Sequence, residues 1–116
     1  MFGLPESFDS SFLVGHTLLQ ACIGQNEVIL RFDGELEISV EGHFSVRSGG
    51  ESRLFESSVD GGIASLDFLY QPIVGASGTV DGTLNLEFPT GSIELYDSSA
   101  HYESYQIQHG SRVYVV

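Results

Sequence analysis

The sequence predicts a mainly β protein, with α+β as the alternative: an antiparallel sheet built from two duplicated hairpin-containing halves, with one or two short helices. Two stretches alternate apolar and polar residues around a short turn, and these stretches resemble each other. Few segments have the apolar spacing of a helix. A chain of 116 residues suits one domain with a single core.

The first hairpin lies in VILRFDGELEISV. Its apolar residues are Val28, Leu30, Phe32, Leu36, Ile38 and Val40. A two-residue turn would put acids on the apolar face, whereas a three-residue turn at 33–35 aligns the apolar residues. Because a one-residue slip moves every side chain to the other face, we expect the longer turn. It sets Arg31 opposite Glu37, a cross-strand ion pair worth at most about 1 kcal/mol.

The second hairpin lies in TLNLEFPTGSIEL. We expect a four-residue turn at 89–92 that pairs Phe88 with Ile93 and Leu86 with Leu95. This register also sets Glu87 opposite Glu94.

The two hairpins align with each other, Leu30 with Leu86, at a period of about 56 residues. HFSVR after the first hairpin resembles HYESY after the second, and ACIGQ before the first resembles ASGTV before the second. We therefore predict a single domain, residues 1–116, whose halves, approximately 1–58 and 59–116, arose by duplication.

The remaining elements are shorter. SFDSSFLVG and GGIASLDFLYQP precede the two halves in corresponding places. In the latter, apolar residues at helical spacing predict a short helix over about 63–71 that Pro72 would stop. Residues 47–53, RSGGESR, read as a loop. The terminal SRVYVV reads as a strand, which is most easily stable inside a sheet. The total is roughly eight strands.

The charge is strongly negative. Four arginines and no lysine face sixteen acids, and the net charge of -12 excludes nucleic acid and anionic membrane as partners. The start of the chain has no basic segment followed by an apolar one, and no apolar run reaches about 20 residues. We therefore expect a soluble, cytoplasmic protein.

The candidate partner-binding residues are the acids of the two hairpins and an adjacent tyrosine: Glu35, Glu37, Glu41, Glu87, Glu94 and Tyr96. Like charges directly opposed across two strands, as expected for Glu87 and Glu94, are unfavourable. Either water tolerates this pair and the acids serve solubility, or a cation from a partner completes it.

Sequence motifs for catalysis and metal binding are absent. The four histidines lack zinc-ligand spacing, and His43 and His101 form a weak metal candidate only if the duplication brings them together. Cys22 lies in an apolar stretch, where a lone cysteine is usually a small buried hydrophobe. No nucleophile elbow or phosphate-binding loop occurs. We expect no enzymatic activity and no cofactor.

Two segments, LLQACIGQNEVILRFDGELEISVEGHF and DGTLNLEFPTGSIELYDSSAHYESYQI, resemble a family of small bacterial proteins catalogued as a domain of unknown function. The family commonly has Tyr-Glu-x-Trp in the strand that corresponds to YESYQI, where this chain has Tyr105 in place of the tryptophan, and it has a glycine-rich C-terminal tail that this chain lacks. The resemblance covers about two thirds of the chain and implies no site residues. In size and acidity the chain is also similar to immunity proteins of bacterial toxin systems.

The expected function is a non-enzymatic module that binds a basic protein, with an immunity-type inhibitor as the concrete form. One alternative is a small-ligand or metal-binding domain at the seam near His43 and His101. Another is a homodimer with a structural role that pairs through residues 113–116. The sequence leaves monomer and homodimer open.

Overall fold

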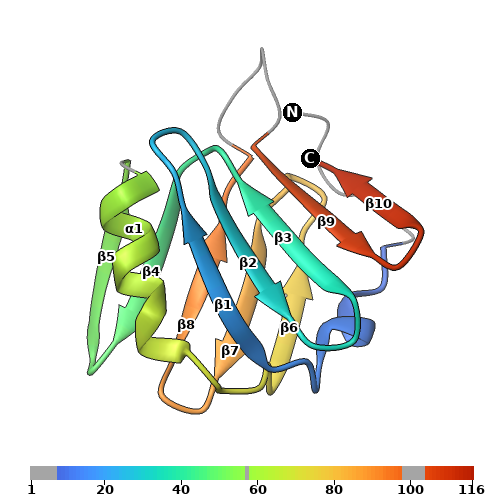
Figure 1. Cartoon of the computed structure of the whole chain (residues 1–116), viewed down its shortest axis with the longest axis horizontal. Coiled ribbons are helices and arrows are strands. Elements are labelled where there is room, and N and C mark those ends of the chain that lie inside the picture. The colour runs from blue at the N-terminus through green and yellow to red at the C-terminus, as the bar shows by residue number, and fades with distance from the viewer. Residues whose placement is uncertain (1–7, 57, 98–103) are drawn as a thin grey trace.

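The computed structural model describes residues 8–56, 58–97 and 104–116 of the chain (Figure 1). Its strands are β1 (Leu18–Ile23), β2 (Val28–Phe32), β3 (Leu36–Val40), β4 (Phe44–Ser48), β5 (Glu51–Phe55), β6 (Gly75–Gly78), β7 (Leu84–Phe88), β8 (Gly91–Leu95), β9 (Tyr105–His109) and β10 (Arg112–Val115). The helical segments are the 3-10 helix η1 (Ser10–Leu13), the α-helix α1 (Ser58–Ser65) and the 3-10 helix η2 (Leu66–Phe68). Within these described ranges, no helix is long and apolar enough to cross a membrane.

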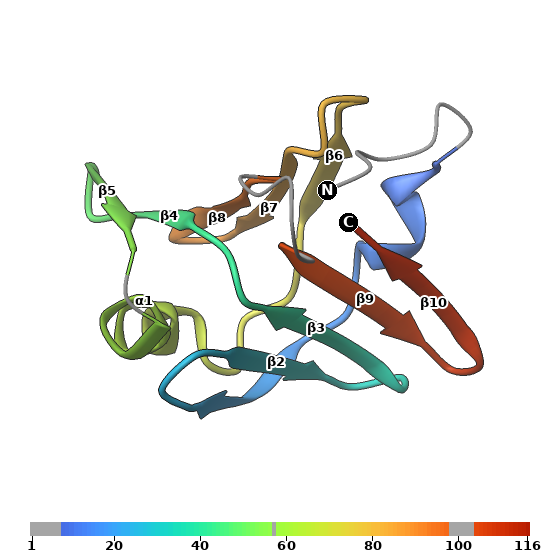
Figure 2. The same cartoon turned by 90° about the horizontal axis from the view of Figure 1, so that it is seen from above.

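The strands form two antiparallel sheets that pack face to face (Figure 2). The first sheet has the order β1-β2-β3-β9-β10, and the second has the order β5-β4-β8-β7-β6. Successive residues of a strand face opposite sides, and the inward-facing apolar residues of both sheets form one buried core. The prediction of a mainly β, antiparallel fold is confirmed, with ten strands among the described residues in place of about eight.

The first hairpin, β2–β3, has the predicted register. Phe32 pairs with Leu36 across the three-residue turn, and the other apolar residues pair as expected. Gly34 in this turn has a φ of 67°, which glycine adopts without strain. The predicted ion pair is also present, because the Nε of Arg31 lies 2.7 Å from the Oε1 of Glu37.

The second hairpin, β7–β8, has a shorter turn than predicted. Phe88 pairs with Gly91, so the turn is residues 89–90 and the expected four-residue turn is wrong. A register shift of two residues keeps every side chain on its face, so the apolar pattern fits both registers. Gly91 is the first residue of β8, and only glycine fits there because a Cβ would overlap the backbone oxygen of Arg47 on the adjacent strand β4.

Two other segments differ from their predictions. Residues 47–53, expected to be a loop, contain the end of β4, a tight turn and most of β5. Gly49 and Gly50 make this turn with φ values of 62° and 84°, so the glycine signal marked a hairpin turn and not a long loop. The C-terminal strand β10 is an edge strand that pairs with β9 alone among the described strands.

The predicted helix over 63–71 is displaced toward the N-terminus, because α1 ends at Ser65 and η2 replaces its last turns. The prediction followed apolar spacing, yet Leu66 is 41% exposed and Tyr70 is 71% exposed. The helix instead turns glycines toward the sheets. A Cβ on Gly61 would overlap the ring of Phe44, so close approach, and not apolar periodicity, sets the buried face of α1.

The two sheets have the same connectivity. Each contains three consecutive strands from one half of the chain and a hairpin from the other half. The β9–β10 hairpin joins the first sheet at β3, and the β4–β5 hairpin joins the second sheet at β8. The halves therefore exchange their last hairpins, and a two-fold relation maps β1–β5 onto β6–β10.

Hydrogen bonds between the linkers that precede β1 and β6 follow the same relation. The Gly15 N–H donates to the Ile73 carbonyl at 2.8 Å, and the Tyr70 N–H donates to the Leu18 carbonyl at 2.7 Å. A shift of 55 in residue number interchanges these two bonds. Gly15 and Tyr70 also share a positive φ, 96° and 67°. This repetition supports the predicted duplication, although common descent of the halves stays a prediction.

A helical segment closes each open end between the sheets. Helix α1 lies between β1 of the first sheet and the β4–β5 hairpin of the second (Figures 1 and 2). At the other end, η1 packs against β6, and its Phe12 ring contacts Tyr114 of β10. Helix α1 thus belongs to the second half and covers a hairpin of the first half. Conversely, η1 belongs to the first half and covers a hairpin of the second half.

Candidate functional site

The six predicted partner-binding residues lie on two different sheets. On the first sheet, Glu37 belongs to β3, Glu35 to the turn before it, and Glu41 follows it. On the second sheet lie the others: Glu87 on β7, Glu94 on β8, and Tyr96 directly after β8. The sequence grouped them as one acidic face because it showed two similar hairpins but not that these hairpins belong to separate layers.

The first sheet has an open groove in which the lining arginine is already paired with a glutamate. The groove has a volume of about 630 Å³. Its lining residues are Arg31, Phe32, Glu35, Leu36, Glu37, Gln108, Gly110 and Ser111. Two of these lining residues, Arg31 and Glu37, form an ion pair with each other. A binding cation would therefore have to compete with an arginine that is already in place.

The outer face of the second sheet consists mostly of small side chains. Its two cross-strand rows are Gly75, Glu87, Ser92, Arg47 and Ser52, and Ser77, Asn85, Glu94, Ser45 and Leu54. Glu87 pairs with Ser92 and Glu94 pairs with Asn85, so the predicted opposition of the two glutamates is wrong. The shorter turn moved β8 by two residues along β7 and separated the like charges.

Neither Glu87 nor Glu94 forms an ion pair with a cation in the described part of the chain. The amide of Asn85 donates a long hydrogen bond of 3.4 Å to the Oε1 of Glu87. The Glu87 carboxylate lies over Gly75, where a Cβ would come within 2.6 Å of its Oε2. Ser92 separates Glu87 from Arg47 in the same row. Both carboxylates are thus available to a cation from outside the chain.

Two larger side chains border the carboxylates. The hydroxyl groups of Tyr96 and Ser45 lie 2.9 Å apart, a hydrogen bond that fixes the tyrosine ring. Leu54, at the β5 end of the row that contains Glu94, is 59% exposed. Tyrosine beside polar groups is typical of protein interfaces. Sequence reasoning missed Ser45 and Leu54, because β4 and β5 reach this face only through pairing with the other half.

The described histidines form no metal centre. Within residues 8–56, 58–97 and 104–116, no group of three or more His, Cys, Asp and Glu could hold a metal ion. Phe44 and Tyr105 begin equivalent strands, so the counterpart of His43 is Ser104 and not His101 as predicted. His101 itself lies outside the described residues. The register of the exchanged hairpins decides which residues of the two halves are equivalent, and this register could not be predicted from the sequence.

Cys22 is half-buried on β1 opposite Ile29. Ile29 alternates with the buried residues of β2, so Cys22 faces the outer side of the first sheet. The prediction of a small buried hydrophobe is correct only in part, because β1 is an edge strand of this sheet.

Groups with shifted pKa values lie in turns and in the core. A hydrogen bond from the Thr79 hydroxyl lowers the pKa of Asp81 in the β6–β7 loop. The backbone N–H of Ser11 lowers the pKa of Asp9, which caps η1. Burial raises the pKa of Tyr105. Each shift has a structural cause, and none of these groups belongs to the two rows on the second sheet.

The fold and the site define a small antiparallel β-sandwich whose second sheet carries Glu87 and Glu94 on its outer face. No family model, curated protein or solved structure matches the chain. The resemblance to the bacterial family of unknown function and the similarity to immunity proteins therefore stay predictions, and the geometry of the site carries the functional argument.

Proposed function

We propose that this protein is a non-enzymatic binding module that engages a basic protein through the outer face of its second sheet. One observation carries the proposal: Glu87 and Glu94 form no ion pair with any described cation and lie among mostly small side chains, beside Tyr96 and Leu54. Small neighbours leave both carboxylates accessible to a flat partner surface. The tyrosine and leucine supply apolar contact next to the charges.

Size and charge support this proposal. The molecule measures 31 × 27 × 24 Å, so one broad face is comparable to the roughly 800 Å² that each partner contributes to a standard interface. The net charge of -12 would speed association with a basic partner by electrostatic attraction at low salt. The concrete form of the proposal is an immunity-type inhibitor that covers a basic toxin.

The test reverses both carboxylates. We expect the double variant Glu87→Lys and Glu94→Lys to lose about tenfold or more in affinity for a basic protein captured from the host lysate at low salt, a change of roughly 1.4 kcal/mol or more. Titration calorimetry of the purified pair measures this loss. The expected cause is the repulsion between the introduced lysines and the basic surface of the partner.

The matched control is the double variant Glu27→Lys and Glu35→Lys. It changes the net charge by the same amount, but Glu27 and Glu35 belong to the hairpin loops of the first sheet. We expect its affinity to fall by less than about threefold, since only long-range attraction is reduced. Equal losses in the two double variants would contradict a specific role for the second sheet.

A second candidate is the homodimer predicted from the terminal strand. It is favoured by the position of β10, an edge strand whose Val113 and Val115 are exposed, since unpaired strand edges can pair with another chain. A mass of two chains in solution that falls to one chain in the Val113→Lys variant would favour it. Deletion of the last residues is unsuitable, because Val116 is buried and bonded to Tyr105.

A further inference from the structure

A small cavity lies between the β4–β5 hairpin and the helical segment α1–η2. Its volume is about 150 Å³. Its lining residues are Val46, Ser48, Glu51, Arg53, Phe55, Ala64 and Asp67. Pockets for drug-sized ligands measure about 300–1,000 Å³, so this cavity suits a single side chain or a fragment of similar size.

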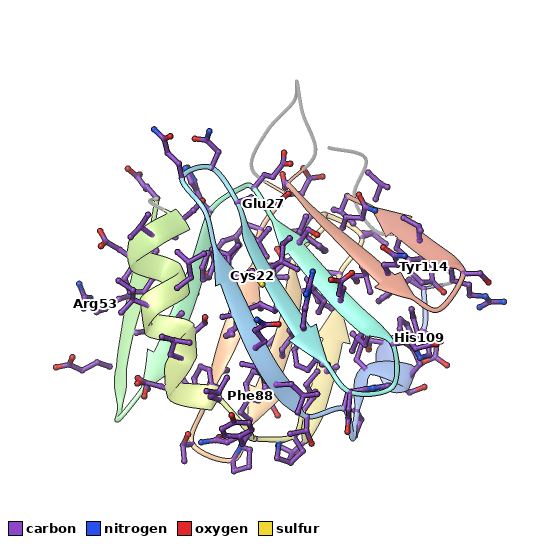
Figure 3. All side chains as sticks on the ribbon, viewed as in Figure 1. Cys22, Glu27, Arg53, Phe88, His109 and Tyr114 are labelled. Carbon is purple, nitrogen blue, oxygen red and sulfur yellow. The ribbon has the colours of Figure 1, made fainter. Side chains whose placement is uncertain are left out.

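The two-fold relation provides an internal comparison for this cavity. It maps the β4–β5 hairpin onto the β9–β10 hairpin at the other end of the molecule. The strand registers make Ser48 equivalent to His109 and Arg53 equivalent to Tyr114. Figure 3 shows Arg53 at one end of the molecule and His109 with Tyr114 at the other.

The helical segments that cover the two hairpins are equivalent as well. Helices η1 and η2 each close with a backbone hydrogen bond across three residues, and these bonds are related by the same spacing of 55 residues. In this alignment Phe12 of η1 corresponds to Asp67 of η2. Three lining residues of the cavity, Ser48, Arg53 and Asp67, therefore have counterparts at the opposite end of the molecule.

At the opposite end, an aromatic side chain fills the corresponding space. The ring of Phe12 stacks on His109 at a centroid distance of 5.3 Å and on Tyr114 at 5.7 Å. Phe8 adds an edge contact to Tyr114 at 5.2 Å. The chain closes this end itself. At the first end Asp67 takes the place of Phe12, and a short carboxylate cannot fill the space that a phenyl ring fills.

The chemistry of the open cavity favours a cationic occupant. Asp67 and Glu51 contribute two carboxylates, against the single guanidinium of Arg53. The Arg53 guanidinium lies 5.1 Å from the centre of the Phe55 ring, a cation–π contact that occupies this cation. Val46, together with Phe55, offers an apolar wall for an aliphatic stem. Lysine and arginine combine such a stem with a charged end.

We infer that this cavity receives one lysine or arginine side chain of the basic partner, at the place that Phe12 occupies in the other half. The inference rests on the proposed function and adds a second contact to it. Leu54 faces the outer surface of the second sheet and Arg53 faces the cavity, so a partner that wraps the edge strand β5 reaches both.

The test uses small cations and the whole chain. We expect n-propylguanidinium or n-butylammonium to shift the ¹⁵N–¹H resonances of Ser48, Arg53, Phe55 and Asp67 at millimolar concentration, and the stronger of the two identifies the preferred side chain. The neutral isostere n-propylurea and the anion butyrate are the controls. Equal binding of n-propylurea, stronger binding of butyrate, or no shifts at these residues would overturn the inference.

Two variants sharpen the test. Asp67→Asn keeps the shape and should weaken cation binding by about two- to fivefold, the range of an exposed ion pair. Asp67→Phe supplies the ring found in the other half and should abolish binding while the melting temperature stays the same or rises. If Asp67→Phe leaves the affinity for the captured basic partner unchanged, the cavity is not a contact, whereas the Glu87 and Glu94 result still decides the proposed function.

Discussion

Tyr105 connects the two sheets through one buried hydrogen bond. Its side chain is fully buried on β9 of the first sheet. Its hydroxyl donates to the Gly82 carbonyl in the β6–β7 loop of the second sheet, at 2.7 Å. The same burial raises the pKa of Tyr105, with the charges of Asp97 and Asp81 as further causes. The Tyr105 hydroxyl group therefore connects the two sheets and should also make the stability of the protein depend on pH.

We expect Tyr105→Phe to destabilise the protein by about 1–3 kcal/mol, because the Gly82 carbonyl loses its partner in a buried place. Urea unfolding at pH 7 measures the change. Tyr70→Phe is the control: Tyr70 is largely exposed, and its hydroxyl forms no hydrogen bond with a described residue. A loss as large in Tyr70→Phe would contradict this account.

The pH dependence of Tyr105 follows from the same burial. The folded-state pKa is raised, so its contribution to stability is complete below the ordinary tyrosine pKa of about 10 and is lost as the pH rises through the folded value. Between about pH 9 and pH 12, the natural protein should lose more stability than Tyr105→Phe. Parallel losses in the two proteins would show that Tyr105 does not titrate with unfolding.

The sequence predicted some side-chain pairs correctly and not others. Arg31 and Glu37 pair as expected, because the alternative turn differed by one residue and would have buried acids. Glu87 and Glu94 do not pair, because the competing register differed by two residues and kept every face unchanged. The observed register brings Gly91 against the backbone of Arg47 in the other half, a close approach that leaves no apolar signal in the sequence.

Among the elements, helix α1 packs closely against both sheets because its buried face contains glycines, which have no side chain. Gly61 and Gly62 are buried, and a Cβ on either would crowd Phe44 or Ile23. Glycine lowers helix stability by about 1 kcal/mol relative to alanine, so this close approach costs intrinsic helix stability. In return, α1 comes near enough to both sheets to close the end of the core.

We expect Gly61→Ala to destabilise the protein by about 1–3 kcal/mol despite the better helix propensity of alanine, because the new Cβ displaces the Phe44 ring. Thermal and urea unfolding measure the change. The double variant Gly61→Ala with Phe44→Leu, compared with each single variant, tests the mechanism. Additive losses in this cycle would contradict a direct clash.

Elements with period-two patterns could be predicted, whereas those set by close packing could not. Both central hairpins appear in the sequence because their apolar residues alternate. The sequence predicts a loop over residues 47–53, within the β4–β5 hairpin, because Arg47, Glu51 and Arg53 interrupt the apolar alternation and most of β5 is exposed. The face of α1 was misplaced because glycine carries no apolar signal. For the same reasons, the cavity between these two elements was missed.

At the scale of the whole molecule, the exchange of hairpins makes the halves interdependent. The apolar residues of β4 or β9 would fit beside any neighbouring strand that has a buried face. The sequence could therefore predict two halves but not the exchange of hairpins between them. In the structure, β4–β5 adds to β8 and β9–β10 adds to β3. Without the other half, each half would leave the inner faces of its strands exposed.

We expect a chain divided between residues 57 and 58 to fold only when its two fragments are combined. Each fragment alone should lack a stable core, and an equimolar mixture should recover the circular dichroism and NMR spectra of the intact chain. Titration of one fragment into the other measures the stoichiometry. A fragment that folds alone as a stable monomer would contradict the exchange of hairpins.

The proposed binding of a basic protein to the outer face of the second sheet can be tested by the NMR footprint of the captured partner on the ¹⁵N-labelled chain. We expect shifts at Glu87, Glu94 and Tyr96, and none at Arg31 and Glu37 on the first sheet. Shifts confined to the first sheet or to the β10 edge would contradict it, as would the failure of any basic protein to bind at low salt.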